Sequence, residues 1–142
     1  MRIEKMRLEA FGALHNLVIE RLSPHLTVFL GANESGKTTL KEFILWVFFG
    51  FERGGKGNRY EPVVGGKPRG RIVVRMANGR RLTFERVGTK ESVFTEGGER
   101  LDATPSGVMA PGFDRRSFER VFAVGLDEMQ GVGVLTEEGV RT

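Results

Sequence analysis

Hydrophobic and polar residues alternate along several short stretches of the chain, which is the pattern that β-strands produce. Residues 2–10 and 16–22 alternate imperfectly and predict two strands joined by a turn at residues 11–13. Residues 71–76 and 80–87 predict a hairpin that turns at Asn78-Gly79, a dipeptide favoured in two-residue hairpin turns. A second short pair is predicted on either side of Gly97-Gly98. Together these strands predict an antiparallel subdomain.

Two other stretches are apolar without alternation. Residues 26–30 form a continuous apolar run, typical of a strand buried on both faces in a mostly parallel sheet. Residues 37–49 are apolar almost all round and predict a deeply buried helix that ends at Gly50. Its helically spaced apolar positions are Leu40, Phe43, Ile44, Val47 and Phe48.

A further helix is predicted at residues 113–122, with Asp114 as its N-cap.

Composition narrows the class of protein but does not define its activity. The chain has 142 residues, no cysteine and a net charge of +4, so disulfides and thiolate metal sites are excluded. Its N-terminus lacks the apolar core of a signal peptide. The longest apolar run, residues 43–49, is far shorter than the about 20 residues that cross a bilayer. We therefore expect a cytoplasmic protein that makes no contact with a membrane.

The segment "FLGANESGKTTL" contains a complete phosphate-loop motif. Gly31, Gly36, Lys37 and Thr38 occupy every fixed position of the Walker A pattern, between the predicted strand and the predicted helix. Glycines let successive backbone N–H groups turn inward around phosphate oxygens, and the helix N-terminus adds its positive dipole end. Lys37 is expected to reach the β- and γ-phosphates and Thr38 to ligate Mg²⁺. The alternative is a glycine-rich turn that binds nothing.

The loop and its flanks also resemble a specific group of proteins. "MRIEKMRLEAFGAL" followed by "LTVFLGANESGKTTLKEFILWVFFGF" resembles the opening of SMC-like ATPase heads, the ABC-type ATPases of the RecN and RecF class in DNA double-strand-break repair. The YhaN-like bacterial members are the most similar of these. "NRYEPVVGG" and "FERVFAVGLDEMQ" resemble the same subfamily, so that the likeness covers essentially the whole chain.

This resemblance implies a fold and a division of the chain. The implied fold is α/β, a P-loop containing nucleoside triphosphate hydrolase fold, as the N-terminal half of an ABC-type ATPase head with an antiparallel β-subdomain. Residues 1–142 then form a single domain, the N-terminal lobe of a split head. Within it lie a Walker A core (1–51), a glycine-rich basic loop (52–70), β-hairpins (71–102) and a helical segment with the Q-loop (103–142).

The resemblance also implies a set of site residues, cofactors and partners. The cofactors are ATP and Mg²⁺, and Gln130 is the Q-loop residue that reaches Mg²⁺ and the attacking water. Lys37 and Gln130 are the implied catalytic residues, and Thr38 and Gln130 the implied metal ligands. The implied nucleotide-binding residues are Gly31, Asn33, Glu34, Ser35, Gly36, Lys37, Thr38 and Thr39. The partners are the chain's own C-terminal lobe and a second ATPase head in a homodimer, with DNA as a further partner.

An alternative function rests on the segment that ends in Asp127-Glu128. An apolar run followed by these two acids is similar to Walker B, in which the aspartate holds Mg²⁺ through water and the glutamate activates the attacking water. The chain would then be a self-contained small P-loop NTPase or kinase, with Asp114 as a further candidate acid. Gly125 interrupts the run, however, and glycine weakens a central strand. A third possibility is a non-catalytic nucleotide- or DNA-binding module.

Basic residues gather around the glycine-rich loop. Cations on a loop can neutralise nucleic-acid phosphates without reading sequence, and they can equally serve to keep a loop soluble. The predicted hairpin extends the basic surface, which Glu85 and Glu91 dilute. His15, in the region where relatives approach the nucleotide base, is expected to be a surface turn residue. The basic residues are Lys56, Arg59, Lys67, Arg69 and Arg71 at the loop, and Arg80, Arg81 and Arg86 on the hairpin.

Overall fold

A computed structural model describes residues 1–32, 35–52 and 57–123 of the chain. Two compact units, Met1–Pro111 and Gly112–Thr142, are each described by themselves. The division of the chain into one domain with four segments stays a prediction. Asn33, Glu34, Lys56, Asp127, Glu128 and Gln130 lie outside the described residues.

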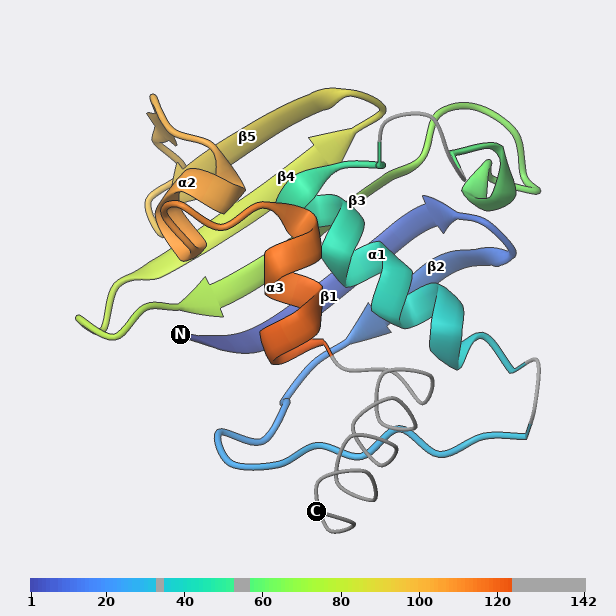
Figure 1. Ribbon diagram of the computed structural model, residues 1–142, viewed down its shortest axis with the longest axis horizontal. Helices are drawn as coiled ribbons and strands as arrows, with labels where there is room; N and C mark the ends of the chain where they lie inside the picture. Colours follow the sequence, from blue (N-terminus) through green and yellow to red (C-terminus); the bar gives the residue numbers. More distant parts are fainter. Residues whose placement is uncertain (33–34, 53–56, 124–142) are drawn as a thin grey trace, which may run out of the picture. The chain divides into compact units, whose positions relative to one another are not determined.

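The first unit is built on a six-stranded antiparallel sheet with the order β2-β1-β3-β4-β5-β6. Hairpins join β1 to β2, β3 to β4, β4 to β5 and β5 to β6. Strand β3 pairs with β1 on the side away from β2 (Figure 1). The strands are β1 (Arg2–Phe11), β2 (Leu14–Ile19), β3 (Arg69–Arg75), β4 (Arg81–Val87), β5 (Lys90–Thr95) and β6 (Arg100–Leu101).

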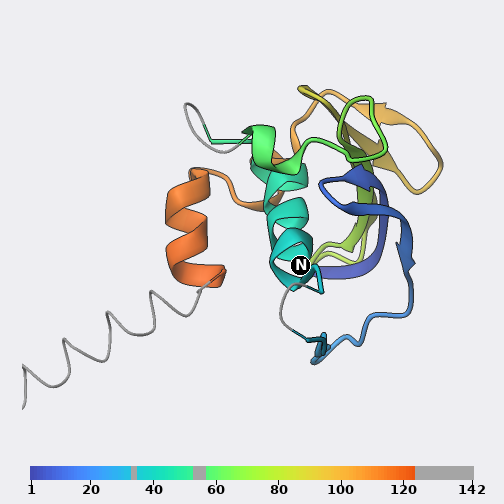
Figure 2. The same cartoon turned by 90° about the vertical axis from the view of Figure 1, so that its right-hand side faces the viewer.

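The alternation in the sequence decides which face of the sheet is covered. In β3 the residues alternate strictly between buried and half-exposed, and so do the first six residues of β4. The buried set faces a single long helix, α1 (Lys37–Phe49), which lies across the sheet as a second layer (Figure 2). At Gly70 of β3 the helix approaches the sheet closely, because a Cβ atom there would lie 2.5 Å from the ring of Phe43 in α1.

Helix α1 supplies much of the core, as its apolar sequence predicts. Six of its residues are buried: Leu40, Phe43, Leu45, Trp46, Val47 and Phe48. They pack with buried residues of the sheet such as Phe11, Ile72 and Phe84. The helix ends at Gly50, which has a φ of +80° and donates its N–H to the Trp46 carbonyl. The predicted helix bounds and its glycine stop are therefore confirmed.

Three short elements complete the described part of the chain. The 3₁₀ turn η1 (Gly57–Tyr60) lies within the glycine-rich segment predicted to be all loop. Helix α2 (Pro105–Met109) is capped by Thr104, whose hydroxyl accepts the Gly107 N–H. In the second unit, α3 (Arg115–Phe122) is capped by Asp114, whose carboxylate accepts the Ser117 N–H at 2.7 Å, as predicted. Among the described helices, none has the length and apolar character to cross a membrane.

One sequence prediction is wrong: residues 26–30 do not form a strand buried on both faces. They are extended but unassigned to any sheet, and Leu26 and Leu30 are 75% and 91% exposed. A strand of this kind is buried only when strands of a parallel sheet flank it and helices cover it. The described sheet is antiparallel and its edge strands are β2 and β6, so that it offers no such place. Strand β2 also begins and ends earlier than predicted.

Candidate nucleotide-binding site

The phosphate loop connects the extended residues 26–30 to α1, and its shape depends on two glycines. A Cβ atom on Gly31 would lie 2.3 Å from Ser35 Oγ, so a larger residue there would force the Ser35 side chain to move. The Ser35 N–H donates to the Ala32 carbonyl at 3.2 Å, so these two residues lie close together. Gly36 has a φ of +92° in the left-handed region and is the N-cap of α1.

The N-terminus of α1 faces this loop with free hydrogen-bonding capacity. The first helical hydrogen bond joins the Leu40 N–H to the Gly36 carbonyl at 2.9 Å, and the N–H groups of the preceding helical residues have no acceptor within the helix. Among the described residues, no side chain caps the helix and no acidic residue stands in its first turn. The positive end of the helix dipole is therefore available to an anion.

Lys37, Thr38 and Thr39 lie in the first turn of the helix, as the motif requires. Lys37 is exposed, and its ammonium donates to the carbonyl of Gly31 across the loop. Thr38 is exposed as well, whereas Thr39 is half-buried. A glycine-lined turn, a free helix N-terminus and a lysine ammonium at one place form a donor set that fits a phosphate chain.

Several of the other predicted site residues are not described by the structure. Asn33, Glu34 and Gln130 lie outside the described residues, and so do the acids of the Walker B alternative. His15 is exposed at the start of β2, paired with Ala10 of β1. Within residues 1–32, 35–52 and 57–123, no group of three or more acidic or histidine side chains forms a cluster that could hold a metal ion by itself.

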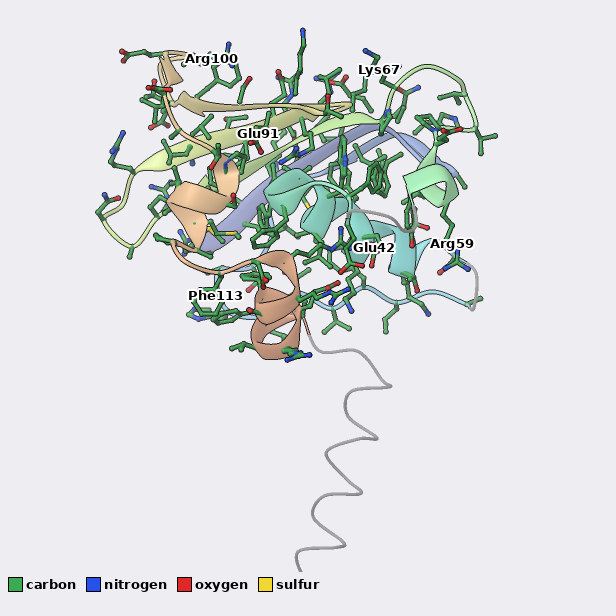
Figure 3. All side chains as sticks on the ribbon, turned by 45° about the horizontal axis from the view of Figure 1, so that its top comes forward. Glu42, Arg59, Lys67, Glu91, Arg100 and Phe113 are labelled. Atoms are coloured by element: carbon green, nitrogen blue, oxygen red, sulfur yellow. The ribbon has the colours of Figure 1, made fainter. Side chains whose placement is uncertain are left out.

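The predicted basic surface is arranged differently from the expectation. Arg59 on η1 and Lys67 before β3 lie at separate places on the molecule (Figure 3). Arg86 is not part of the surface at all, since it is only 6% exposed. The basic residues that do gather lie on the sheet face opposite α1. Arg69, Arg71 and Arg81 of the predicted basic surface lie on this face. Sequence reasoning missed the cations of β1, because β1 is distant along the chain from the β3–β4 hairpin that it joins.

Two carboxylates organise that outer face. Glu4 contacts Arg2, Arg75 and Arg81, with the shortest distance, 2.6 Å, to Arg75 Nε. The hydrogen bond from Arg75 is the main reason that the pKa of Glu4 lies below its ordinary value. Glu9 likewise lies within ion-pair distance of three arginines, which are Arg7, Arg69 and Arg71. Each carboxylate is thus shared by three cations.

Comparison with known proteins defines the family of this chain. The sequence model of the family described as "AAA domain" matches residues 1–139. The chain belongs to the AAA domain family. This AAA domain is 28% identical over 143 aligned residues to the uncharacterized protein YhaN of Bacillus subtilis (strain 168). The alignment covers 99% of the AAA domain but 14% of the length of YhaN.

A solved structure has the same fold. It is described as "Structural biochemistry of ATP-driven dimerization and DNA stimulated activation of SMC ATPases" and superimposes with a TM-score of 0.58. The superposition covers 89% of the AAA domain and 86% of that chain, at 18% sequence identity. The likeness confirms the predicted fold, which is an α/β P-loop fold like the N-terminal half of an ABC-type ATPase head with an antiparallel β-subdomain. The resemblance to YhaN-like proteins is confirmed as well.

Proposed function

We propose that this AAA domain is the ATP–Mg²⁺-binding lobe of an SMC-like ATPase that acts on DNA in repair or chromosome maintenance. The observation that carries the proposal is the glycine-closed loop between Gly31 and Gly36, set against the free N-terminus of α1. A triphosphate carries a high negative charge, and backbone N–H groups at a helix N-terminus are suited to hold it.

Each residue of the loop has a role in this proposal. Backbone N–H groups from Gly31 to Gly36 surround the β-phosphate, and Lys37 leaves the Gly31 carbonyl to contact the β- and γ-phosphates. The Thr38 hydroxyl ligates Mg²⁺ and the Thr39 hydroxyl donates to the α-phosphate. Gln130 reaches the metal and the attacking water. When bound, Mg²⁺ supplies positive charge that neutralises the phosphate oxygens.

The remaining catalytic groups belong to a second lobe. The exposed apolar residues 26–30 run directly into the phosphate loop, and a strand of that kind needs neighbours that the described residues do not provide. The AAA domain spans 14% of the length of YhaN. We assign the covering strands to the protein's own C-terminal lobe, and the completed site to a pair of heads.

The proposal predicts that this chain binds ATP–Mg²⁺ weakly and hydrolyses almost none. The discriminating variants are Asp114→Asn, Asp127→Asn and Glu128→Gln, measured by single-turnover and steady-state phosphate release. Asp114→Asn keeps an N-cap for α3 while removing the acid. None of the three should change turnover. Steady-state hydrolysis that is lost in Lys37→Ala and in one of these variants would establish the self-contained enzyme instead.

A contact with DNA is supported by the outer face of the sheet. Seven cations stand there with five carboxylates, so the surface keeps an excess of positive charge after ion pairing. The cations are Arg2, Lys5, Arg7, Arg69, Arg71, Arg75 and Arg81; the carboxylates are Glu4, Glu9, Glu20, Glu85 and Glu96. Phosphate contacts from such a face bind duplexes without reading their sequence.

We expect duplex DNA to bind this face with an affinity that falls steeply with salt. In fluorescence anisotropy, the double variant Arg7→Gln/Arg69→Gln should bind more weakly and with a smaller slope of log K against log salt, by about one unit for each phosphate that is no longer neutralised. The control Arg59→Gln removes a cation from η1 that is not among the seven cations of the outer face, and it should leave both quantities unchanged. Equal weakening in the two proteins would exclude this face as the DNA site.

A further inference from the structure

The turn between β1 and β2 packs directly against the phosphate loop. A Cβ atom on Gly36 would lie 3.0 Å from Leu14 Cδ2, so the Leu14 side chain is seated on the Cα of the helix N-cap. In the turn itself, a Cβ atom on Gly12 would lie 3.4 Å from Cγ2 of Thr39 in α1. The turn therefore touches both the last residue of the loop and the first turn of α1.

The same turn is also held by Tyr60, the last residue of η1, and by Val63, which follows η1. The Gly12 N–H donates to the Tyr60 carbonyl at 2.8 Å, and the Val63 N–H donates to the Gly12 carbonyl at 3.0 Å. The Tyr60 ring stacks on the Phe11 ring, with centroids 5.1 Å apart and an interplanar angle of 15°. Both backbone groups of Gly12 are thus used, and the turn has little freedom to move away from the loop.

We propose that Leu14 is a positioning residue that holds Gly36, and with it the N–H groups at the start of α1, in the arrangement that binds phosphate. The inference rests on the proposed function, since it concerns the same site. Gly36 has a φ of +92°, and glycine passes readily between this region and others. The Leu14 side chain packs against Gly36 and prevents it from adopting other backbone conformations. The orientation of the first-turn N–H groups is then set before a ligand arrives.

A role for Leu14 in the core alone does not account for this placement. Leu14 is half-buried and packs against the core cluster, and both of its methyl groups also lie within 3.5 Å of a Cβ atom built on Gly36. Val18, on the same strand, is 48% exposed and is not in the core cluster. Leu14 and Val18 therefore form a matched pair for substitution, with the same chemistry and strand but different neighbours.

The test compares Leu14→Ala, Leu14→Met and Val18→Ala in the whole chain. ATP–Mg²⁺ affinity is measured by titration calorimetry, and hydrogen exchange of the Leu40 amide, which bonds to the Gly36 carbonyl, is measured without nucleotide. We expect Leu14→Ala to lower the affinity about tenfold and to speed Leu40 exchange about tenfold, since a truncated side chain leaves the site free to move. Leu14→Met refills the space and should restore both to within about twofold.

The two readouts separate failure of this inference from failure of the proposed function. If the wild-type chain binds no ATP–Mg²⁺, the proposed function fails, and the inference about Leu14 as a determinant of binding falls with it whatever the exchange shows. If the wild-type chain binds but Leu14→Ala binds equally well, or Leu40 exchanges no faster than in Val18→Ala, the inference alone is overturned. Equal loss of affinity in Leu14→Ala and Val18→Ala also overturns it.

Discussion

Replacing Lys37 with alanine should weaken binding of ATP–Mg²⁺ by about a hundredfold. The ammonium is the one side-chain cation that the loop motif directs at the β- and γ-phosphates. A hydrogen bond to a charged group contributes about 1.5–3 kcal/mol, and a hundredfold change in affinity corresponds to about 2.7 kcal/mol. Binding is measured by calorimetry or by anisotropy of a fluorescent ATP analogue.

The stability of the Lys37 variant should be close to that of the wild-type chain. In the described structure Lys37 is exposed and contacts the carbonyl of Gly31, so its removal takes little away from the fold. Lys41, four residues further along the same helix, is the matched control. Lys41→Ala should bind nucleotide nearly as well as the wild type. Equal affinity of Lys37→Ala and the wild type would exclude phosphate binding by this loop.

Replacing Arg86 with methionine should destabilise the fold by about 2–3 kcal/mol, somewhat less than the full cost of breaking a buried ion pair from one side. Arg86 on β4 is buried; its Nη2 group pairs with Glu91 of β5 and its Nε–H donates to the Val47 carbonyl near the end of α1. The guanidinium also lies against Gly50, where a Cβ atom would be 3.3 Å from Nη1. Burial lowers the pKa of Arg86, and the attraction of Glu91 opposes this effect.

The expected loss of stability follows from what the substitution leaves behind. Methionine fills much of the space but leaves the Glu91 carboxylate without its partner, and breaking a buried pair from one side costs about 3–5 kcal/mol. The Glu91 side chain is 32% exposed, and water therefore recovers part of that cost. Urea unfolding monitored by Trp46 fluorescence measures the change. Arg100→Ala, at an exposed arginine of β6 (Figure 3), should change stability by less than about 0.5 kcal/mol.

An Arg86→Met protein as stable as the wild type would mean that the pair contributes nothing net. The double variant Arg86→Met/Glu91→Leu supplies a further check, because it removes both charges together. It should recover most of the missing stability, as replacement of a whole buried pair by apolar residues is often neutral. Failure of the double variant to recover would assign the destabilisation to the Val47 carbonyl and the α1 terminus instead.

Local signals in the sequence were sufficient for most of the secondary structure and for the position of the phosphate loop. The helix from Lys37 to Phe49, its stop at Gly50 and the Asp114 cap all depend on neighbours within one or two turns, and each was predicted. The hairpin turn at Asn78-Gly79 belongs to the same class, with Gly79 at a φ of +83°. Such features need only local backbone physics, which a single sequence contains.

The prediction of a buried strand at residues 26–30 was wrong because the described sheet has no strands that flank this segment. Apolar composition indicates that a segment tends to be buried, but its burial depends on which strands are available to flank it. Arg86 was misjudged in the opposite direction: an arginine on a hairpin is usually exposed, and only the approach of the α1 terminus and Glu91 makes a buried place for it.

The sequence by itself determined that this protein has a phosphate-loop motif, where the motif lies, and which helix follows it. These depend on glycine positions, one lysine and apolar spacing, all within a short stretch of the chain. Only the tertiary structure decided that Leu14 rests on Gly36, that Gly12 is held by residues 60–63, and that three arginines converge on each of Glu4 and Glu9. Most of those contacts join strands and loops far apart in the chain, and strand pairing across such distances is fixed by the packing of the whole sheet against α1 rather than by any local pattern.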